Sequence, residues 1–462
     1  MPRVRILFVV SEVAPFSKTG GLADVAAALP PALVELGHDV LVVSPRYRGV
    51  DPDAAPDDGV ERLFVERPDL FDRPGLYGEA GADYPDNDVR FAALGDAALA
   101  GANRLRFAPD VVHLHDWQTG LVALTLRRRP RRARTVARPA TVFTVHNLAY
   151  QGSFGVETLD RLGLPVQTFT PEGIEFHGRV SFMKAGLVYA DAVTTVSPRY
   201  AEEIQTPEFG FGFNGILRAR TDDLVGILNG ADYGTWSPET DALVPARFSA
   251  TRLAGKAKDK AALQRRVGLE ENAGAPLLGV VSRLDHQKGI DVVADAAEGF
   301  AALGAQLVVL GSGDPVLEAR LAGLAADFPS NIRTETGFDD PLAHLIQAGS
   351  DMLLVPSRWE PCGLTQMYAL RYGTVPVVTA VGGLDDTVED GVTGFKAAPH
   401  AGAAASRAAL LQAVRTAAGL FRADRAAWRR MMRRGMARDF SWAASAKRYE
   451  ALYRSLTAGT SA

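Results

Sequence analysis

The chain has 462 residues, of which 47% are hydrophobic and 23% charged, and its formal net charge is -4. This length exceeds what one hydrophobic core supports, so two or three domains are expected, and the acidic balance argues against a dedicated nucleic-acid-binding protein. The single cysteine excludes an intramolecular disulfide and favours a cytoplasmic location. The apolar run in MPRVRILFVVSEVAPF is too short to cross a bilayer and lacks a small-residue cleavage site, so we expect neither a membrane span nor a leader.

The same run predicts a first buried strand, and SKTGGLADVAAALP (17–30) follows it as a turn into a helix. Glycines at 20 and 21 let the backbone approach a ligand closely, and a helix N-terminus offers free N–H groups and a positive dipole end. Lys18 adds a full charge. The pattern therefore indicates an anion site, with phosphate as the ligand; the alternative is an ordinary strand-to-helix turn with a solvated lysine.

Further short apolar runs alternate with helical patterns, which predicts parallel sheets covered by helices on both faces. Two such series predict an α/β protein with two doubly wound domains, over residues 1–250 and 251–440. A C-terminal helix within 441–462 is predicted to pack back on the first domain. The predicted strands lie in HDVLVVSP (38–45), VVHLH (111–115), TVFTVHN (141–147), AVTTVSP (192–198), LVGILNG (224–230), PLLGVVSRLD (276–285), AQLVVLGSGD (305–314), DMLLVPSRWE (351–360) and VPVVTAVGG (375–383).

Polar side chains follow several of these strands, at the edge where ligands bind in such sheets. In HLHDW (113–117), strand alternation puts His113 and His115 on one face, with Asp116 beyond the strand end. This set could ligate a metal, but no further His or Cys cluster completes it, so we expect no metal site. His146, after another strand, could bind a ligand or be a satisfied core histidine. The strand-end residues are His115-Asp116-Trp117, His146-Asn147, Asn229-Gly230, Arg283, Gly311-Ser312-Gly313 and Glu360.

SRLDHQKGID (282–291) carries the strongest signal for a diphosphate. Arg283 supplies a planar fork of donors and Lys288 a point charge, which together suit two phosphates. The alternative is an exposed ion-paired segment.

PSRWEPCGLTQ (356–366) places a carboxylate beside a helix start. Free N–H groups near Gly363 could bind phosphate or a sugar hydroxyl, and Glu360 suits a polyol or an oxocarbenium-like charge. The alternative is a helix cap by Glu360 or Thr365. Cys362 has no identifiable base partner, so we interpret it as a small residue lining the site and not as a nucleophile.

The one dense basic run, RRRPRRAR (127–134), could contact nucleic acid or an anionic effector. In a net acidic chain, between a predicted helix and strand, a solvated loop is favoured.

Eight stretches in one order resemble bacterial glycogen synthases and the related plant starch synthases. The resemblance extends roughly from residue 4 to residue 455. It implies two Rossmann-like domains that face each other across a cleft, as in B-type glycosyltransferases. The stretches are KTGGLADV, HDWQTGL, TVHNLAYQG, KAGLVYADAVTTVSP, EIQTPEFGFG, GILNGAD, SRLDHQKGID and PSRWEPCGLTQMYALRYGTVPVV.

The resemblance also implies a reaction, the transfer of glucose from ADP-glucose to the non-reducing end of an α-1,4-glucan with retained configuration. The expected partners are ADP-glucose and a glycogen or maltooligosaccharide acceptor, without metal, other cofactor, nucleic acid or membrane, and no oligomeric state is predicted. Since no carboxylate here is an obvious nucleophile, our working hypothesis is a front-face substitution guided by the leaving phosphate.

Individual residues match positions with known roles in that family. His146, Glu360, Arg283, Lys288 and Asp116 are the expected catalytic residues, with Arg283 and Lys288 on the phosphates and Glu360 near the donor glucose. The expected donor- and substrate-binding residues are Lys18 (the ADP-glucose-binding lysine), Gly21 (backbone near the phosphates), Asp24 (near the nucleotide), Tyr77 (packed on the donor), Trp117, Asn147 and Asn229 (with Asp116 and His146 on the glucose side), and Cys362, Gly363, Leu364 and Thr365 (a loop around sugar and phosphate).

The chain departs from the family pattern at a few positions. Asp385 stands where alanine is usual, Trp359 where phenylalanine is common, and Tyr368 where related retaining transferases often carry a second glutamate. The last difference favours the glycogen and starch synthase branch. Phe338, in TGFDD, is predicted to stack on the base.

Three other functions compete with this interpretation. They are a sucrose- or trehalose-type transferase that uses UDP-glucose, a non-catalytic glucan-binding protein, and a pyridoxal-phosphate-dependent phosphorylase. KTGGLADV together with PCGLTQ argues against the first, and the intact set of site residues argues against the second.

Overall fold

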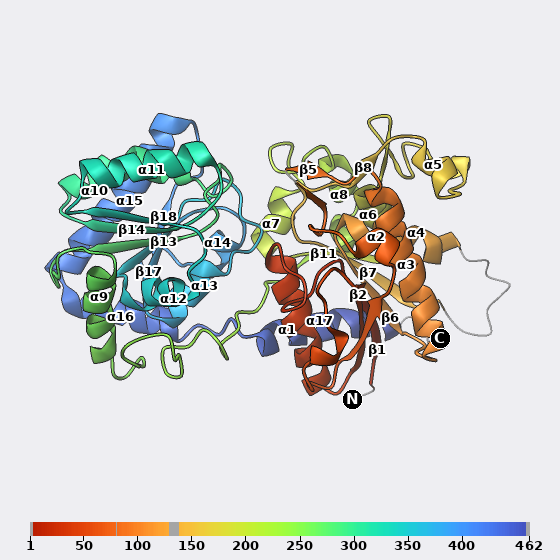
Figure 1. Cartoon of the computed structure of the whole chain (residues 1–462), viewed down its shortest axis with the longest axis horizontal. Helices are drawn as coiled ribbons and strands as arrows, with labels where there is room; N and C mark the ends of the chain where they lie inside the picture. The colour runs from red at the N-terminus through yellow and green to blue at the C-terminus, as the bar shows by residue number, and fades with distance from the viewer. Residues whose placement is uncertain (1–2, 80, 129–137, 459–462) are drawn as a thin grey trace. The chain divides into compact units, whose positions relative to one another are not determined.

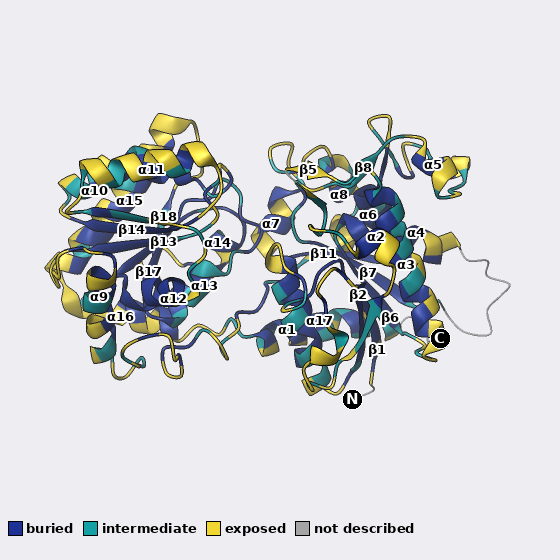
Figure 2. Ribbon diagram, viewed as in Figure 1, coloured by how far each residue is buried: buried dark blue, intermediate teal, exposed yellow. Residues whose placement is uncertain are grey.

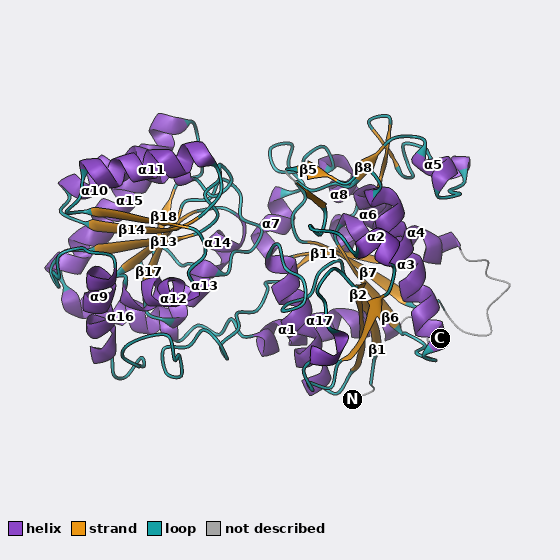
Figure 3. Ribbon diagram, in the orientation of Figure 1, coloured by secondary structure: helices purple, strands orange, loops and turns teal. Residues whose placement is uncertain are grey.

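The computed structural model describes residues 3–79, 81–128 and 138–458 (Figure 1). The chain forms two compact units, which we call unit 1 (Met1–Gly230 with Trp442–Ala462) and unit 2 (Ala231–Ser441). Each unit is a parallel sheet with helices on both faces (Figure 3). The prediction of two doubly wound α/β domains is thereby confirmed.

Unit 1 has a seven-stranded sheet in which every neighbouring pair is parallel. Its central strands are buried on both faces, which explains their continuous apolar sequences. Strand β1 lies between β2 and β6, so the strand order reverses between β1 and β6. In spatial order the strands are β12 (Leu224–Gly226), β11 (Ala192–Thr195), β7 (Ala140–Val145), β6 (Val111–His115), β1 (Arg5–Val9), β2 (Asp39–Pro45) and β3 (Glu61–Val65).

Helices cover both faces of this sheet, each over its own hydrophobic core (Figure 1). On one face lie α3 (Asn87–Arg104), α4 (Gly120–Arg128) and α6 (Phe182–Tyr189). On the other lie α1 (Gly21–Glu35) and the C-terminal helix α17 (Trp442–Ala458), which pack on each other. Buried Tyr449 and Tyr453 bind α17 to this core.

Shorter elements complete unit 1. They include a two-stranded antiparallel sheet and a three-stranded one, ordered β8-β10-β9. Their bounds, with those of the short helices, are β4 (Gly78–Glu79), β5 (Ala82–Asp83), β8 (Ser153–Phe154), β9 (Glu175–Phe176), β10 (Arg179–Ser181), η1 (Pro52–Ala54), α2 (Pro68–Phe71), η2 (Trp117–Thr119), α5 (Thr158–Arg161), η4 (Val166–Thr168), α7 (Pro198–Glu203), α8 (Asn214–Ala219) and η5 (Thr221–Asp223).

Unit 2 has a six-stranded, fully parallel sheet whose order reverses between β13 and β16. Its strands, in spatial order, are β15 (Ile332–Thr336), β14 (Gln306–Gly311), β13 (Leu277–Val281), β16 (Met352–Val355), β17 (Val375–Thr379) and β18 (Phe395–Ala397). Its helices are α9 (Ala254–Arg266), α10 (Ile290–Ala302), α11 (Pro315–Asp327), α12 (Asp340–Gly349), α13 (Thr365–Arg371), α14 (Gly382–Thr387), α15 (Ala403–Ala423) and α16 (Arg425–Met436).

The central strands of both sheets are buried, whereas the outward faces of the helices are exposed (Figure 2). Helix α11, for example, buries only Leu317 and Leu321. Within the described ranges, we find no helix with the length and apolar character needed to cross a membrane. Arg127 and Arg128 end α4, and the rest of the predicted basic loop lies outside the described residues.

The boundary between the units lies after Gly230, not near residue 250 as expected. The segment 231–250 packs on unit 2 because Trp236 stacks on His344 and on Tyr368, with ring centroids 3.7 and 4.5 Å away. The buried carboxylate of Asp241 also accepts a hydrogen bond from the Tyr372 hydroxyl at 2.5 Å. The second crossing lies between Ser441 and Trp442, at the start of α17.

Gly120 is required where α4 starts against α6. A Cβ atom at this position would lie 1.9 Å from the carbonyl oxygen of Phe182. We expect Gly120→Ala to lower the free energy of unfolding by about 3 kcal/mol, measured by urea denaturation. Gly419→Ala is the matched control, because a Cβ in this exposed part of α15 would meet nothing within 4 Å. The control should gain about 0.5–1 kcal/mol, and equal effects of the two substitutions would contradict the packing argument.

Candidate functional site

The reversal points of the two sheets coincide with most of the predicted site residues. In doubly wound sheets, ligands bind outside the carboxyl ends of the strands at such points. In unit 1, β1 leads into KTGG, β6 into Asp116 and β7 into His146. In unit 2, β13 leads to Arg283 and Lys288, and β16 to Glu360. We call these two groups the unit 1 site and the unit 2 site.

Glu12 anchors the loop that follows β1. Its Oε2 atom accepts hydrogen bonds from the backbone N–H and the hydroxyl of Thr19, at 2.6 and 2.9 Å. The side chain is buried, and burial raises the pKa of Glu12 to about 7, although the bonds from Thr19 oppose this. The turn is closed further by Ser17, whose hydroxyl accepts from the Val13 N–H. These contacts hold the KTGG backbone in one conformation.

The predicted anion-binding residues lie where this loop enters α1. Gly20 is the N-cap residue of α1 and Gly21 its first residue, and a Cβ on Gly21 would meet nothing within 4 Å. Lys18 is half exposed, and its ammonium binds the carboxylate of Asp24 in the first turn of α1, at 2.6 Å. Asp24 therefore orients the lysine in this structure. The open space at Gly21 leaves its backbone accessible to a ligand.

Asp116 has a strained backbone, with φ 54° and ψ -178°. For a non-glycine residue such a conformation costs about 1–3 kcal/mol and is typical of functional sites. Its carboxylate accepts a hydrogen bond from the His146 N–H at 2.7 Å, which joins the ends of β6 and β7. Burial raises the pKa of Asp116 to about 7, and the backbone N–H groups of His146 and Asn147 oppose that rise.

Three imidazoles lie together beside Asp116. The His115 Nδ1 atom is 2.9 Å from His146 Nε2, and the rings of His113 and His115 are 4.1 Å apart. The predicted placement of His113 and His115 on one face is therefore confirmed. Burial lowers the pKa of His146 to about 3 and the pKa values of the other two well below their ordinary value, so all three are neutral at physiological pH.

The remaining unit 1 residues form the walls of this site or its surroundings. The Tyr77 hydroxyl is 2.8 Å from Ser11 Oγ, close to Glu12, and Trp117 is buried against Phe91. Asn147 accepts from the Ala149 N–H and so shapes the turn after β7. The side-chain oxygen of Asn229 is buried and finds no hydrogen-bond partner among the described residues, which favours a ligand hydroxyl as its partner.

In the unit 2 site, Arg283 is held loosely. Its guanidinium lies 3.1 Å from Asp285 Oδ2 and 3.4 Å from Gln287 Oε1, and its side chain is 55% exposed. The ion pair that the alternative interpretation predicted is therefore present. An exposed pair of this kind is weak, so Arg283 can turn to an anionic ligand at little cost.

Lys288 and Glu360 form a more buried pair in the same site. Lys288 Nζ is 2.5 Å from Glu360 Oε2, and this oxygen also accepts from the Ser357 hydroxyl at 2.9 Å. Glu360 is 5% exposed. The close approach of the two loops depends on Gly289, with φ 67°, where a Cβ would lie 2.0 Å from the Pro356 carbonyl oxygen.

The loop after β16 is fixed by contacts to the loop after β13. Arg358 makes two bonds to the Asp291 carboxylate, at 2.6 and 2.7 Å, and Gln287 donates to the Trp359 carbonyl at 3.3 Å. Cys362 is buried, and a Cβ on Gly383 would lie 2.2 Å from its carbonyl oxygen. These contacts place residues 360–365 between the ends of β16 and β17.

The helix-cap alternative for this loop is wrong. The N-cap residue of α13 is Leu364, and in the described chain no side-chain hydrogen bond caps this helix. Glu360 instead binds Lys288, and Thr365 begins the helix. Gly363 adopts φ 71°, a conformation that favours glycine, and its carbonyl accepts from the Gln366 amide at 2.9 Å.

Two of the departures from the family pattern have local partners. Asp385 forms an ion pair with Lys396 at 2.6 Å, so the additional carboxylate is neutralised within unit 2. Tyr368 stacks on Trp236 and helps to hold the segment 231–250.

Several residues of these sites are not among those predicted from the sequence. Glu12 is the only acidic residue within the apolar run of the first strand and its turn. An acid in an apolar run before a glycine-rich turn was the sequence feature that could have identified it as a site residue. Asp285, Gln287 and Ser357 are ordinary polar loop residues. Their roles become evident only from the contacts to Arg283, Lys288, Glu360 and Trp359.

The metal alternative for HLHDW finds no support in these contacts. His113 is 2.6 Å from Thr144 Oγ1 and 2.8 Å from the Tyr453 hydroxyl, and His115 binds His146. Over residues 3–79, 81–128 and 138–458, no three His, Cys, Asp or Glu side chains are grouped as metal ligands would be.

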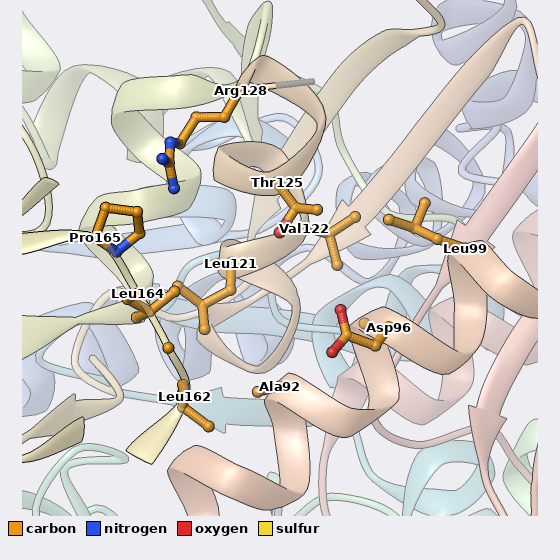
Figure 4. Close-up of a pocket in the computed structure, with 12 residues that line it drawn as sticks. Ala92, Asp96, Leu99, Leu121, Val122, Thr125, Arg128, Leu162, Leu164 and Pro165 are labelled. Carbon is orange, nitrogen blue, oxygen red and sulfur yellow. The ribbon is translucent and has the colours of Figure 1, made fainter. Parts of the chain in front are cut away.

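A cavity of about 460 Å³ lies elsewhere in unit 1, between α3, α4 and residues 162–165 (Figure 4). Asp96 lies on α3, and Thr125 and Arg128 lie on α4, at its wall. None of the predicted site residues lines it, so it plays no part in the assignments above.

The chain has two doubly wound units. One sheet carries cations and a carboxylate at its reversal point, and the other carries a cluster of an acid and imidazoles. This combination defines a B-type glycosyltransferase. Comparison with known proteins specifies the family. A family model described as the starch synthase catalytic domain matches residues 5–219, and one described as glycosyl transferases group 1 matches residues 264–417. The chain belongs to the glycogen synthase family.

Individual relatives cover essentially the whole chain. Glycogen synthase from Anaeromyxobacter dehalogenans (strain 2CP-C) is 52% identical, over 98% of this chain and 100% of that protein. Glycogen synthase from Myxococcus xanthus (strain DK1622) is 48% identical, with the same coverage. The catalytic domain of starch synthase IV from Arabidopsis thaliana, solved bound to ADP and acarbose, is 32% identical, with a TM-score of 0.89 over 99% of this chain and 100% of that one. Sucrose-phosphate synthase from Thermosynechococcus elongatus, 21% identical with a TM-score of 0.65 over 99% of this chain and 100% of that one, shares the fold.

Proposed function

We propose that this glycosyltransferase moves glucose from ADP-glucose to the non-reducing end of an α-1,4-glucan with retained configuration. The observation that carries the proposal is the unit 2 site, where Arg283, Lys288 and Glu360 lie at the reversal point of the sheet. A diphosphate with an attached sugar needs this combination, two cations for the phosphates and a carboxylate for the sugar. The likeness to a starch synthase domain solved with ADP supports ADP as the leaving group.

Unit 2 binds the nucleotide in this proposal. As the sugar–phosphate bond breaks, negative charge develops on ADP, and Arg283 and Lys288 stabilise it electrostatically. Phe338 is 90% exposed, on the loop between β15 and α12, and its ring is available to stack on the adenine. Side-chain cations neutralise the leaving diphosphate, so the proposal assigns no step to a metal ion.

Unit 1 acts on the sugar. Asp116, His146, Asn147 and Asn229 bind and orient the glucose, and Lys18 with the free backbone at Gly21 adds positive potential near the phosphates. Glu360 stabilises the positive charge that develops on the sugar ring. The acceptor hydroxyl attacks on the face that the phosphate leaves, and the leaving phosphate oxygen takes its proton, which retains configuration without a covalent glucosyl-enzyme.

The first experiment compares ADP-glucose with UDP-glucose as donors and glycogen as acceptor, by nucleotide release with and without a chelator. We expect selective, chelator-resistant ADP release, and about a tenfold or larger loss of kcat/KM in Lys18→Ala, because a charge-assisted phosphate contact is removed. Lys258→Ala, on an exposed position of α9, is the matched control. Preference for UDP-glucose would overturn the donor assignment, loss of activity with chelator would overturn the metal-free step, and glucan binding without turnover would overturn the transferase itself.

A further inference from the structure

His146 has a specific neighbour, His115, which is not among the predicted catalytic and substrate-binding residues. The His115 Nδ1 atom lies 2.9 Å from His146 Nε2, and His115 is fully buried against the rings of Phe8 and His113, each with a centroid 4.1 Å away. Both imidazoles are neutral because burial lowers their pKa values. One nitrogen of this pair must therefore donate its proton to the other.

The surroundings of His115 decide the direction of this hydrogen bond. His115 Nε2 is buried, and within the described part of the chain it has no hydrogen-bond partner. If His146 donated, the neutral His115 would carry its proton on Nε2, as a buried N–H without an acceptor. If His115 donates from Nδ1, its Nε2 keeps only a lone pair, and an unpaired buried acceptor is tolerated better than an orphaned N–H. The favoured arrangement is His115 Nδ1–H donating to His146 Nε2.

This direction determines what His146 can do. With Nε2 accepting, the neutral ring carries its proton on Nδ1. The Nδ1 atom of His146 forms no hydrogen bond with any residue that the structure describes. It is also not one of the fully buried polar atoms that lack a partner, so it is accessible to a ligand. We propose that His115 is a positioning residue that fixes His146 as a neutral Nδ1–H donor toward a substrate oxygen, and not as a general base.

A second layer of contacts holds His115 in place. His113 packs on its ring and is itself bound at both nitrogens, by Thr144 and by the hydroxyl of Tyr453 on α17. Thr144 is in turn 2.5 Å from Thr194 Oγ1. The ring of His115 therefore cannot rotate without displacing buried neighbours from β7, β11 and α17.

The test combines tautomer and kinetic measurements on the full chain. In ¹⁵N-labelled wild type, the side-chain nitrogen shifts of His146, assigned with His146→Gln, should report the Nδ1–H tautomer. His115→Asn should keep it, because the Asn amide N–H occupies the place of Nδ1–H. His115→Phe keeps the ring but removes the donor, so the tautomer should become mixed and kcat should fall about tenfold, with KM nearly unchanged. His115→Asn should restore most of kcat.

His177→Asn is the control, since His177 is exposed and belongs to neither site, and it should leave the His146 tautomer and kcat unchanged. An Nε2–H tautomer in the wild type, or wild-type kcat in His115→Phe, would overturn the proposal. The kinetic measurement rests on the proposed glucosyl transfer, whereas the measurement of the His146 tautomer does not. A fixed Nδ1–H tautomer without any transferase activity would therefore refute the proposed function and retain the positioning role.

Discussion

Arg283→Ala is expected to lower kcat/KM for glucosyl transfer about 100- to 1000-fold while leaving the free energy of unfolding nearly unchanged. In the proposed function this guanidinium stabilises the charge that develops on the leaving diphosphate, and removing one such donor has an effect of this size. The side chain is 55% exposed, and among the described residues its guanidinium forms polar contacts only with Asp285 and Gln287, so its removal leaves no buried charge behind. Nucleotide release measures the activity, and urea denaturation measures stability.

Arg320→Ala is the matched control, because Arg320 on α11 is 44% exposed and pairs with Asp295 away from the strand ends. It should retain wild-type kcat/KM. Lys288→Ala provides a contrast, since it should lose activity and also about 3 kcal/mol of stability, as Glu360 would stay buried without its cation. Activity of Arg283→Ala within threefold of the wild type would remove the unit 2 site as the diphosphate site.

Glu12→Gln is expected to stabilise the protein at pH 8, by on the order of 3 kcal/mol. Burial raises the pKa of Glu12 from 4.5 to about 7, a difference of about 2.5 units, and each unit corresponds to about 1.4 kcal/mol. Between these two pH values the folded protein binds the proton more tightly than the unfolded chain. The contribution of Glu12 to stability therefore falls as pH rises from 4.5 to 7, and the full penalty remains above pH 7.

A glutamine at position 12 carries no charge, so this pH-dependent contribution should vanish, while its amide oxygen can still accept from Thr19. The measurement is urea denaturation of wild type and variant at pH 5, 6, 7 and 8, which should give curves that converge toward pH 5. Glu61→Gln, at an exposed position of β3, should follow the wild type. A difference that is the same at pH 5 and pH 8 would show that Glu12 is not held in the proposed environment.

The unit 1 site contains energetically unfavourable features next to its ligand-facing groups. Asp116 combines a strained φ with a carboxyl group whose pKa burial raises, and Glu12 is a second buried acid in the same unit. Folding alone would not favour such features, but a binding site with fixed donors and acceptors requires them. In unit 1, these features therefore lower the stability of the fold but keep the site preorganised.

The sequence by itself determined the architecture and predicted where the candidate sites lie. Buried parallel strands are continuous apolar runs, so β1, β2, β6, β7, β13, β14, β16 and β17 were recognisable without any partner. Their carboxyl ends then marked the site, because ligands of doubly wound sheets bind there. The strands β3, β15 and β18 lie at sheet edges and were missed, since they are short or mix polar and apolar residues, as in ERLFV and IRTET.

Only the tertiary structure decided which distant side chains meet. Lys288 and Glu360 are separated by 72 positions, and His113 and Tyr453 by 340. The same is true of Trp236 on His344 and Tyr368, the stacking that assigns residues 231–250 to unit 2. Local patterns encode which face of an element is buried, but the partner of a buried polar atom depends on how several elements pack together. For that reason the proposed direction of the hydrogen bond between His115 and His146 rests on the folded chain and not on HLHDW.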